Sequence, residues 1–137
     1  MGRGSSQEAA SILYGSDRTR QRVTVGGAVE YYDANGQLYK VRVPPASREN
    51  PEPYYQTPKQ IESGDSFSAA CTIHMRDGIP HRDPDQGPAV EYDGGDKLWM
   101  VDGESHREDG PATIWADGWE IWAQHGRHIA RLRMAQR

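Results

Sequence analysis

The side chains best suited to chemistry stand in two matching strings, His81-Arg82-Asp83 and His106-Arg107-Glu108-Asp109. Imidazole and carboxylate groups can bind a metal ion together, so His81, His106 and His128 with Asp83 or Asp109 are candidate ligands. The chain lacks a His-x-x-x-His or Cys-x-x-Cys pair that would support such a site. The same groups can instead hold a turn and bridge neighbouring hairpins by hydrogen bonds. We expect this structural role, with no metal and no cofactor.

Other catalytic patterns are weaker. Cys71 lies three residues before His74, but a thiol in this setting is more often a small buried hydrophobic residue than a nucleophile. Four aspartates at turn positions lack the dense ligand series of a calcium loop; they are Asp93, Asp96, Asp102 and Asp117. No glycine-rich phosphate loop and no nucleophile elbow occurs. We therefore expect that the protein is not an enzyme, with a metal-dependent hydrolase as the catalytic alternative.

Charge is distributed unevenly along the chain. Residues 75–124 carry four basic and twelve acidic side chains, whereas residues 125–137 carry four basic and no acidic ones. An acidic block attracts cationic partners and repels nucleic acid. We expect a protein partner, with nucleic acid contacted, if at all, through the basic tail. The candidate partner-binding residues are Asp83, Asp85, Asp93, Asp96, Glu104, Glu108, Asp109, His81, His106, Arg82 and Arg107.

These residues belong to a tandem repeat. Gly78 and Gly103 begin units 25 residues apart, and the Gly-Pro-Ala triplets at 87–89 and 110–112 lie 23 residues apart. A two-residue insertion near Pro84 explains the difference, and a third unit begins at Gly126. In each unit we expect a five-residue strand, a turn at residues 93–96 or 117–118, and a return strand. Stacked hairpins bury the surface that one hairpin leaves exposed.

The composition fits an all-β fold with a thin core. Leu, Ile, Val and Phe total only 19 of 137 residues, whereas Tyr and Trp total 11, and 15 Gly with nine Pro favour many turns. Aromatic side chains supply the missing apolar area. The predicted core is Tyr31, Tyr92, Trp99, Trp115 and Trp122.

The chain divides into five predicted segments. Residues 1–22 form an arm with a short helix from Ser5 to Gly15, where Ser5 and Glu8 have capping-box spacing. Residues 23–43 form a degenerate hairpin repeat turning at Asn35-Gly36, with both turn residues at positive φ. Residues 44–65 are a long loop, residues 66–126 the repeat region, and residues 127–137 a basic tail that frays.

The string from Gly103 to Ala112, with its His-Arg-Glu-Asp-Gly-Pro-Ala run, resembles the MORN-like variant repeats of bacterial, phage and large-virus proteins. The resemblance covers about 50 residues. It implies tandem antiparallel β-hairpins, a scaffolding or protein-contact role, and a phage or prophage origin.

Two functions remain open. The first is a structural or scaffolding module, such as a component of a phage particle, that contacts neighbouring subunits. The second is an inhibitor of a host defence nuclease or guide complex that acts through the acidic face. A polar N-terminus, one cysteine and no long apolar run predict neither secretion nor a membrane span. We expect the protein in the host cytoplasm or in the virion.

Overall fold

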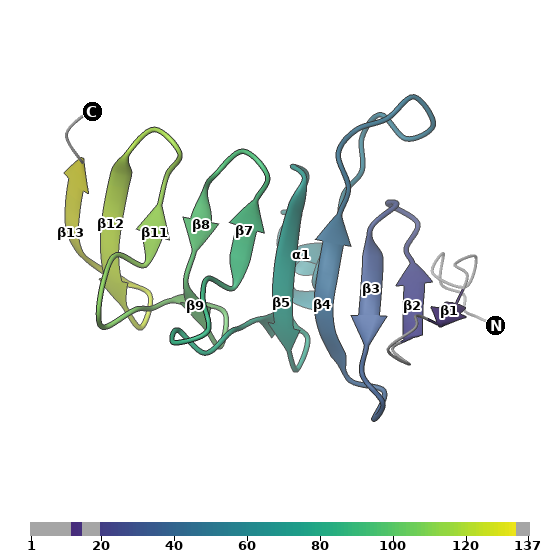
Figure 1. Ribbon diagram of the computed structural model, residues 1–137, viewed down its shortest axis with the longest axis horizontal. Helices are drawn as coiled ribbons and strands as arrows, with labels where there is room; N and C mark the ends of the chain where they lie inside the picture. The colour runs from purple at the N-terminus through teal and green to yellow at the C-terminus, as the bar shows by residue number, and fades with distance from the viewer. Residues whose placement is uncertain (1–11, 15–19, 134–137) are drawn as a thin grey trace. The chain divides into compact units, whose positions relative to one another are not determined.

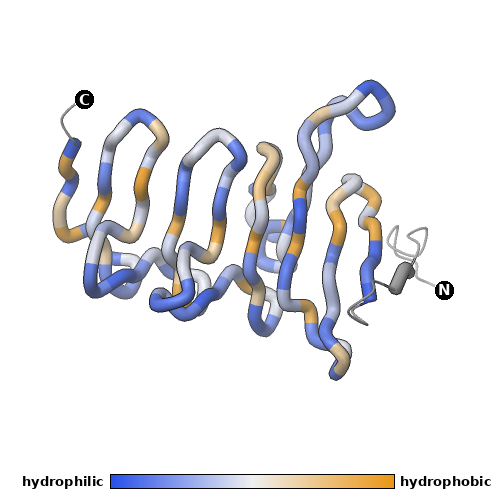
Figure 2. The backbone as a smooth tube through the Cα atoms, viewed as in Figure 1, coloured by the Kyte–Doolittle hydropathy of each residue, from blue (hydrophilic) through white to orange (hydrophobic). Residues whose placement is uncertain are grey.

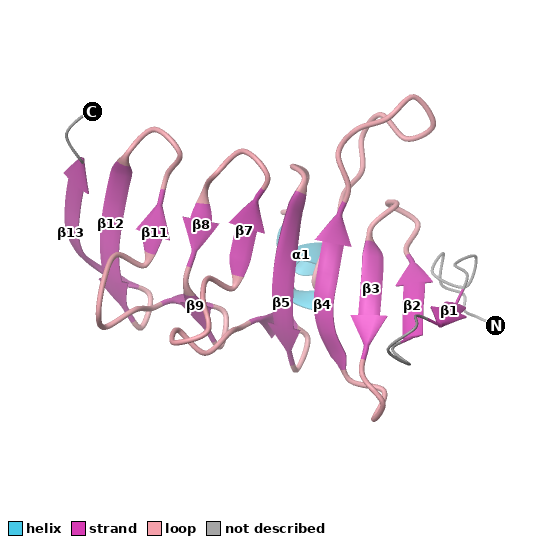
Figure 3. Cartoon of the chain, viewed as in Figure 1, coloured by secondary structure: helices cyan, strands magenta, loops and turns pink. Residues whose placement is uncertain are grey.

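A computed structural model describes residues 12–14 and 20–133, and the chain is mainly β (Figures 1 and 3). Two compact units divide between Thr72 and Ile73. Strand β5 (Cys71–Arg76) runs across this division.

The first unit contains four antiparallel strands, in which each strand pairs with the next. They are β1 (Ile12–Tyr14), β2 (Arg20–Val23), β3 (Val29–Tyr32) and β4 (Leu38–Val43). The predicted helix from Ser5 to Gly15 is wrong for Ile12–Tyr14, because these residues pair with β2, and its other residues lie outside the described part. A helix this short has little stability of its own against a strand ladder.

The predicted loop at 44–65 contains a helix, α1 (Pro58–Ser63). The Thr57 side chain accepts a hydrogen bond from the Gln60 N–H, and the Gln60 side chain accepts one from the Thr57 N–H. Pro58 fits the first turn, and Gly64 ends the helix in the left-handed conformation. The loop is also anchored by bridges from Tyr54 to Gly27 and from Tyr55 to Phe67.

The second unit continues from β5 with further short strands, shown in Figure 1. They are β6 (Ile79–Pro80), β7 (Val90–Tyr92), β8 (Lys97–Leu98), β9 (Met100–Val101), β10 (Glu104–Ser105), β11 (Thr113–Ile114), β12 (Trp119–Gln124) and β13 (Arg127–Arg133). Antiparallel pairs link β7, β8, β11, β12 and β13 in that order, and β9 pairs with β10. The predicted fraying tail is wrong for residues 127–133, because pairing with β12 satisfies their backbone on one side.

Two kinds of turn alternate in the second unit. Residue pairs Asp77-Gly78, Asp102-Gly103 and His125-Gly126 each place both residues at positive φ, which is the type I′ signature. The hairpin tips are different: Tyr92 and Trp115 each precede a three-residue loop that ends in a glycine at positive φ. This is the conformation of a type I turn with a glycine bulge.

The Asn35-Gly36 turn in the first unit also has this bulged form, so the prediction of positive φ at both residues is wrong. Only Gly36 has a positive φ. The reason is Asp33, whose Oδ1 accepts hydrogen bonds from the N–H groups of Asn35 and Gln37, both at 2.9 Å. That side-chain cap stabilises a type I turn at this position.

The core is formed more by small aliphatic residues than by rings. Trp99 is buried with 7% of its surface exposed, but Tyr31, Tyr92, Trp115 and Trp122 are only half-buried, which corrects the predicted core. Tyr92 and Trp115 stand at the hairpin tips, where little chain covers them. The fully buried side chains are Ala28, Val41, Val43, Cys71, Ile73, Ala89, Val90 and Ala112.

Candidate functional site

The two repeat histidines make the same pair of hydrogen bonds. The backbone N–H of His81 donates to the carbonyl of His74 at 2.9 Å, and that of His106 donates to the carbonyl of Trp99 at 3.0 Å. Each Nδ1 then accepts from the first residue of the following type I′ turn, at 2.9 Å from Asp102 and 3.0 Å from His125. The ring proton of a neutral imidazole in this geometry is on Nε2. Both histidines therefore lock one repeat to the next.

The two repeat arginines are equally matched. Arg82 Nη1 donates to the carbonyl of Pro88 at 3.2 Å, and Arg107 Nη1 donates to that of Pro111 at 3.1 Å. Each guanidinium lies against the glycine of its Gly-Pro-Ala triplet, where an added Cβ would come within 2.9 Å at Gly87 or 2.8 Å at Gly110. A side chain at either position would displace the guanidinium from this place, and at Gly87 the positive φ of 133° also favours glycine.

Arg107 also lies over the ring of Trp99, with Cζ 4.0 Å from its centroid. A guanidinium above an indole face is attracted by the ring quadrupole. His81, Arg82, His106 and Arg107 therefore make internal contacts of the repeat frame, which is the structural role that we expected beside their candidacy as partner-binding residues.

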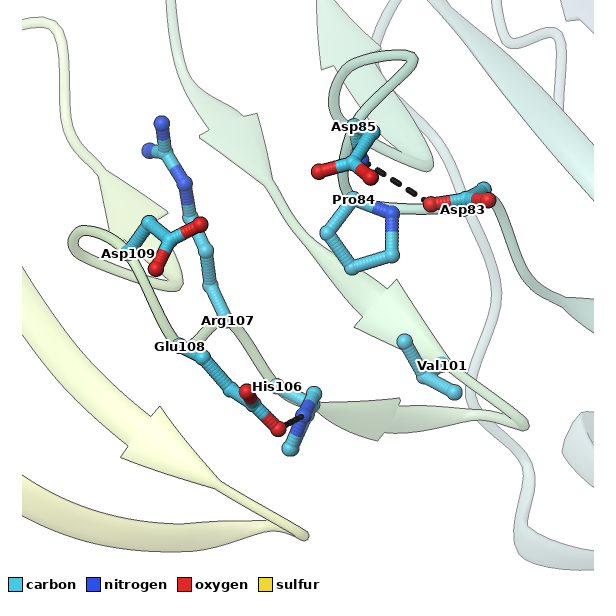
Figure 4. Close-up of a pocket in the computed structure, with 8 residues that line it drawn as sticks. All are labelled: Asp83, Pro84, Asp85, Val101, His106, Arg107, Glu108 and Asp109. Atoms are coloured by element: carbon cyan, nitrogen blue, oxygen red, sulfur yellow. Dashed lines mark hydrogen bonds and ion pairs between the residues drawn. The ribbon is translucent and has the colours of Figure 1, made fainter.

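A groove of about 520 Å³ lies between the two repeat loops (Figure 4). Its lining residues are Asp83, Pro84, Asp85, Val101, His106, Arg107, Glu108 and Asp109. The four acidic residues are exposed, and they come from the loop before β7 and the loop before β11. The groove thus combines a fixed frame with exposed negative charge.

The loops that carry these carboxylates are shaped by local hydrogen bonds. Asp83 Oδ1 accepts from the Asp85 N–H at 3.0 Å, which tightens the first loop. Glu108 Oε2 lies 3.5 Å from His106 Nε2 in the second. Within the described residues, the carboxylates of Asp85 and Asp109 make no such contact and point their charge to solvent.

Three predicted acidic candidates lie outside the groove. Asp93 and Asp96 belong to the β7–β8 tip, where Asp96 Oδ1 accepts from the Ala116 N–H of the neighbouring tip at 2.7 Å. Glu104 begins β10 and stands beside the turn at Gly126. The sequence missed the contact role of Asp102, which forms an ion pair with Arg76 at 2.6 Å.

The candidate metal ligands of the alternative interpretation are not gathered into one site among the described residues. Within residues 12–14 and 20–133, no group of three or more His, Cys, Asp or Glu side chains is arranged to hold an ion. Cys71 is a free thiol that is fully buried in β5.

A buried carboxylate cluster in the first unit was not predicted. Glu30 is 5% exposed and accepts hydrogen bonds from the hydroxyls of Tyr32 at 2.9 Å and Tyr55 at 2.8 Å, with Arg22 Nη1 at 3.7 Å. Burial, followed by the charge of Glu30 and the hydrogen bond to it, raises the pKa of Tyr55 far above its ordinary value. Burial and Glu30 also raise the pKa of Tyr32. The alternation of residues along β3 places Glu30 and Tyr32 on one face with Ala28, and this pattern could have indicated the cluster. The contact with Tyr55 could not have been found from the sequence.

Among the described residues, no helix has the length and apolar character needed to cross a membrane. Comparison of the chain with protein-family models, with curated proteins and with solved structures finds no match.

Proposed function

We propose that the protein is a non-catalytic protein-binding or scaffolding module that holds a cationic segment of its partner in the groove between the repeat loops. The observation that carries this proposal is the set of four exposed carboxylates around a groove of about 520 Å³. Lysine and arginine side chains form their strongest hydrogen bonds with such ionised acceptors.

The rigidity of the frame supports the proposal. The histidines and arginines next to these carboxylates are fixed to backbone atoms at distances of 2.9–3.2 Å. A binding surface held before the partner arrives loses less conformational entropy on association. The same bonds support a non-catalytic role, because a general base needs an imidazole nitrogen open to the reacting group.

The resemblance to MORN-like repeats guides the choice of partner. We propose neighbouring subunits of a phage assembly, with the protein in the host cytoplasm or the virion. The acidic groove also favours a second candidate function, inhibition of a host defence nuclease or guide complex, in which clustered carboxylates take the place of nucleic-acid phosphates. In both cases the partner surface is positively charged.

Charge neutralisation tests the proposal. The groove variant carries Asp83→Asn, Asp85→Asn, Glu108→Gln and Asp109→Asn, which keep the side-chain acceptors and the shape. The matched control removes the same charge at exposed residues elsewhere, with Glu49→Gln, Glu52→Gln, Glu62→Gln and Glu91→Gln.

Tagged full-length protein and both variants are used to capture partners from lysate of the native host, with mass spectrometry as the measurement. We expect the wild type and the control to recover the same protein in fixed ratio and the groove variant to lose it. Virion subunits would support scaffolding, and a host nuclease would support inhibition. Equal recovery by all three proteins would refute the groove as the binding surface.

A further inference from the structure

Strand β13 (Arg127–Arg133) presents an open edge of sheet. It pairs with β12 on one side, and no described strand pairs with its other side. All seven of its residues are exposed. A long exposed edge offers a row of backbone N–H and C=O groups to another extended chain.

The side chains of this edge are basic and apolar. Residues 127–133 contain three arginines and one histidine and no acidic residue. Ile129 and Leu132 are 60% and 52% exposed, and Figure 2 shows hydrophobic and hydrophilic segments alternating along the strand. Such an edge can recognise both the charge and the side-chain alternation of a partner strand.

Two arginines of the strand contact the same aromatic ring. Arg131 Cζ lies 4.5 Å and Arg133 Cζ 5.8 Å from the ring centroid of Trp119 on β12. In the β12–β13 register, Arg131 is paired with Ile121 and Arg133 with Trp119, so both arginines stand on one face. Both guanidinium groups lie over Trp119 of β12 and both residues are exposed, so the strand presents two positive charges on one face of the sheet.

These charges select against a second copy of the same strand. An antiparallel pair centred on Ala130 would place Arg127 opposite Arg133 at both ends. Like charges directly opposite each other destabilise a strand pair. A register shift in the β12–β13 pairing near Trp122 further disfavours a flat contact between copies. An acidic strand avoids this like-charge repulsion, so the same charges favour it.

We propose that β13 is a docking edge for an extended acidic segment of a partner protein, which adds to the sheet as one more antiparallel strand. Its carboxylates, at alternate positions, bind Arg131 and Arg133, and a small apolar residue between them packs near Leu132. This surface is separate from the acidic groove, and it does not require that the groove bind anything.

A nucleic acid fits the edge less well. A phosphate backbone cannot continue the N–H and C=O ladder of a strand, although it can bind arginines. Trp119 is covered by Arg131 and Arg133, which competes with the stacking of a base on its ring. The acidic segment uses both the backbone and the side chains of the edge.

The test uses full-length protein and a fluorescently labelled seven-residue peptide of alternating Glu and Val, with fluorescence anisotropy as the measurement. Three probes accompany it: a Lys-Val peptide of the same length, the Glu-Val peptide with alternate backbone nitrogens methylated, and oligothymidylate. Methylation keeps the charge but removes ladder donors. We expect the Glu-Val peptide to bind, the methylated peptide to bind at least about tenfold more weakly, and the Lys-Val peptide and oligothymidylate not to bind.

Two variants locate the site. Arg131→Glu with Arg133→Glu should weaken binding of the Glu-Val peptide at least about tenfold, and the milder Arg131→Gln with Arg133→Gln should weaken it less. Circular dichroism confirms that each variant is folded. The groove variant described above should bind this peptide at least as tightly as the wild type, so failure of the groove proposal and failure of this one are distinguishable.

Several results would overturn the proposal. Equal affinity for the methylated peptide would mean ionic attraction without strand addition. Binding of oligothymidylate in place of the peptide would identify a nucleic-acid surface. Self-association in analytical ultracentrifugation that is abolished by the arginine substitutions would make a second copy the occupant. Absence of Glu-Val binding would remove the proposal altogether.

Discussion

Substitution of Gly110 by alanine should destabilise the second unit through one contact. The added Cβ would lie 2.8 Å from Arg107 Cζ, so the guanidinium must move. It then loses its hydrogen bond to the Pro111 carbonyl, which for a charged donor is worth about 1.5–3 kcal/mol, and its position over Trp99, worth about 0.5–2 kcal/mol. Because Arg107 is half-buried and its flexible guanidinium can readjust, we expect a net loss of only about 1–2 kcal/mol of unfolding free energy.

Gly94 supplies the matched control in the same unit. An added Cβ there meets no atom within 4 Å, and its φ is outside the left-handed region, as is that of Gly110. Gly94→Ala should be neutral or stabilising by up to about 1 kcal/mol, because alanine restricts the unfolded chain. The two substitutions therefore differ mainly in their contact with Arg107.

Urea denaturation followed by tryptophan fluorescence measures the effect, since all four tryptophans lie in the second unit. The midpoint should fall for Gly110→Ala with an unchanged slope. In an Arg107→Ala background the same glycine substitution should cost almost nothing, because the clashing group is gone. A cost of equal size in both backgrounds would refute the argument that Arg107 requires this glycine.

Two further predictions concern buried polar groups. The indole N–H groups of Trp99 and Trp122 are buried and have no hydrogen-bond partner among the residues that the structure describes. Trp99→Phe should therefore cost well under half of the roughly 3–5 kcal/mol expected for Trp99→Ala, and equal midpoints in urea would contradict this. The pKa of Tyr55 is higher in the folded than in the unfolded chain, where it is about 10. Its contribution to stability is therefore complete below about pH 10 and is lost as the pH rises further. Tyr55→Phe should show a shallower loss of stability between about pH 10 and 12 in circular dichroism, and parallel curves would disprove the assignment.

The repeat pattern was the most informative part of the sequence. Spacings of 25 and 23 residues predicted matching hairpins. In the structure His81 and His106 make equivalent hydrogen bonds, and so do Arg82 and Arg107. These bonds depend on which backbone groups the turns leave unpaired. The residue types predicted a structural role for these loops, but they could not show which backbone groups each side chain binds.

Other features carried signals that were present but overlooked. The string from Thr57 to Gly64 holds a capping box, an N-terminal proline and a terminal glycine, which together indicate helix α1. The aromatic core was overestimated because ring area does not reveal whether a second layer covers the ring. Strand β13 looked like a charged tail, since a fully exposed strand shows little of the burial that a hydrophobic pattern detects.

The arginine hydrogen bond that closes each of the two repeat loops has a practical consequence for engineering. Gly87 follows Arg82 by five positions, and Gly110 follows Arg107 by only three. Both arginines nevertheless donate to the next proline carbonyl at nearly the same distance, 3.2 and 3.1 Å. The hydrogen bond from the arginine to the proline carbonyl therefore forms across loops of different length. We therefore expect that foreign peptide segments can be grafted between the arginine and the glycine, which would make the unit a small display scaffold.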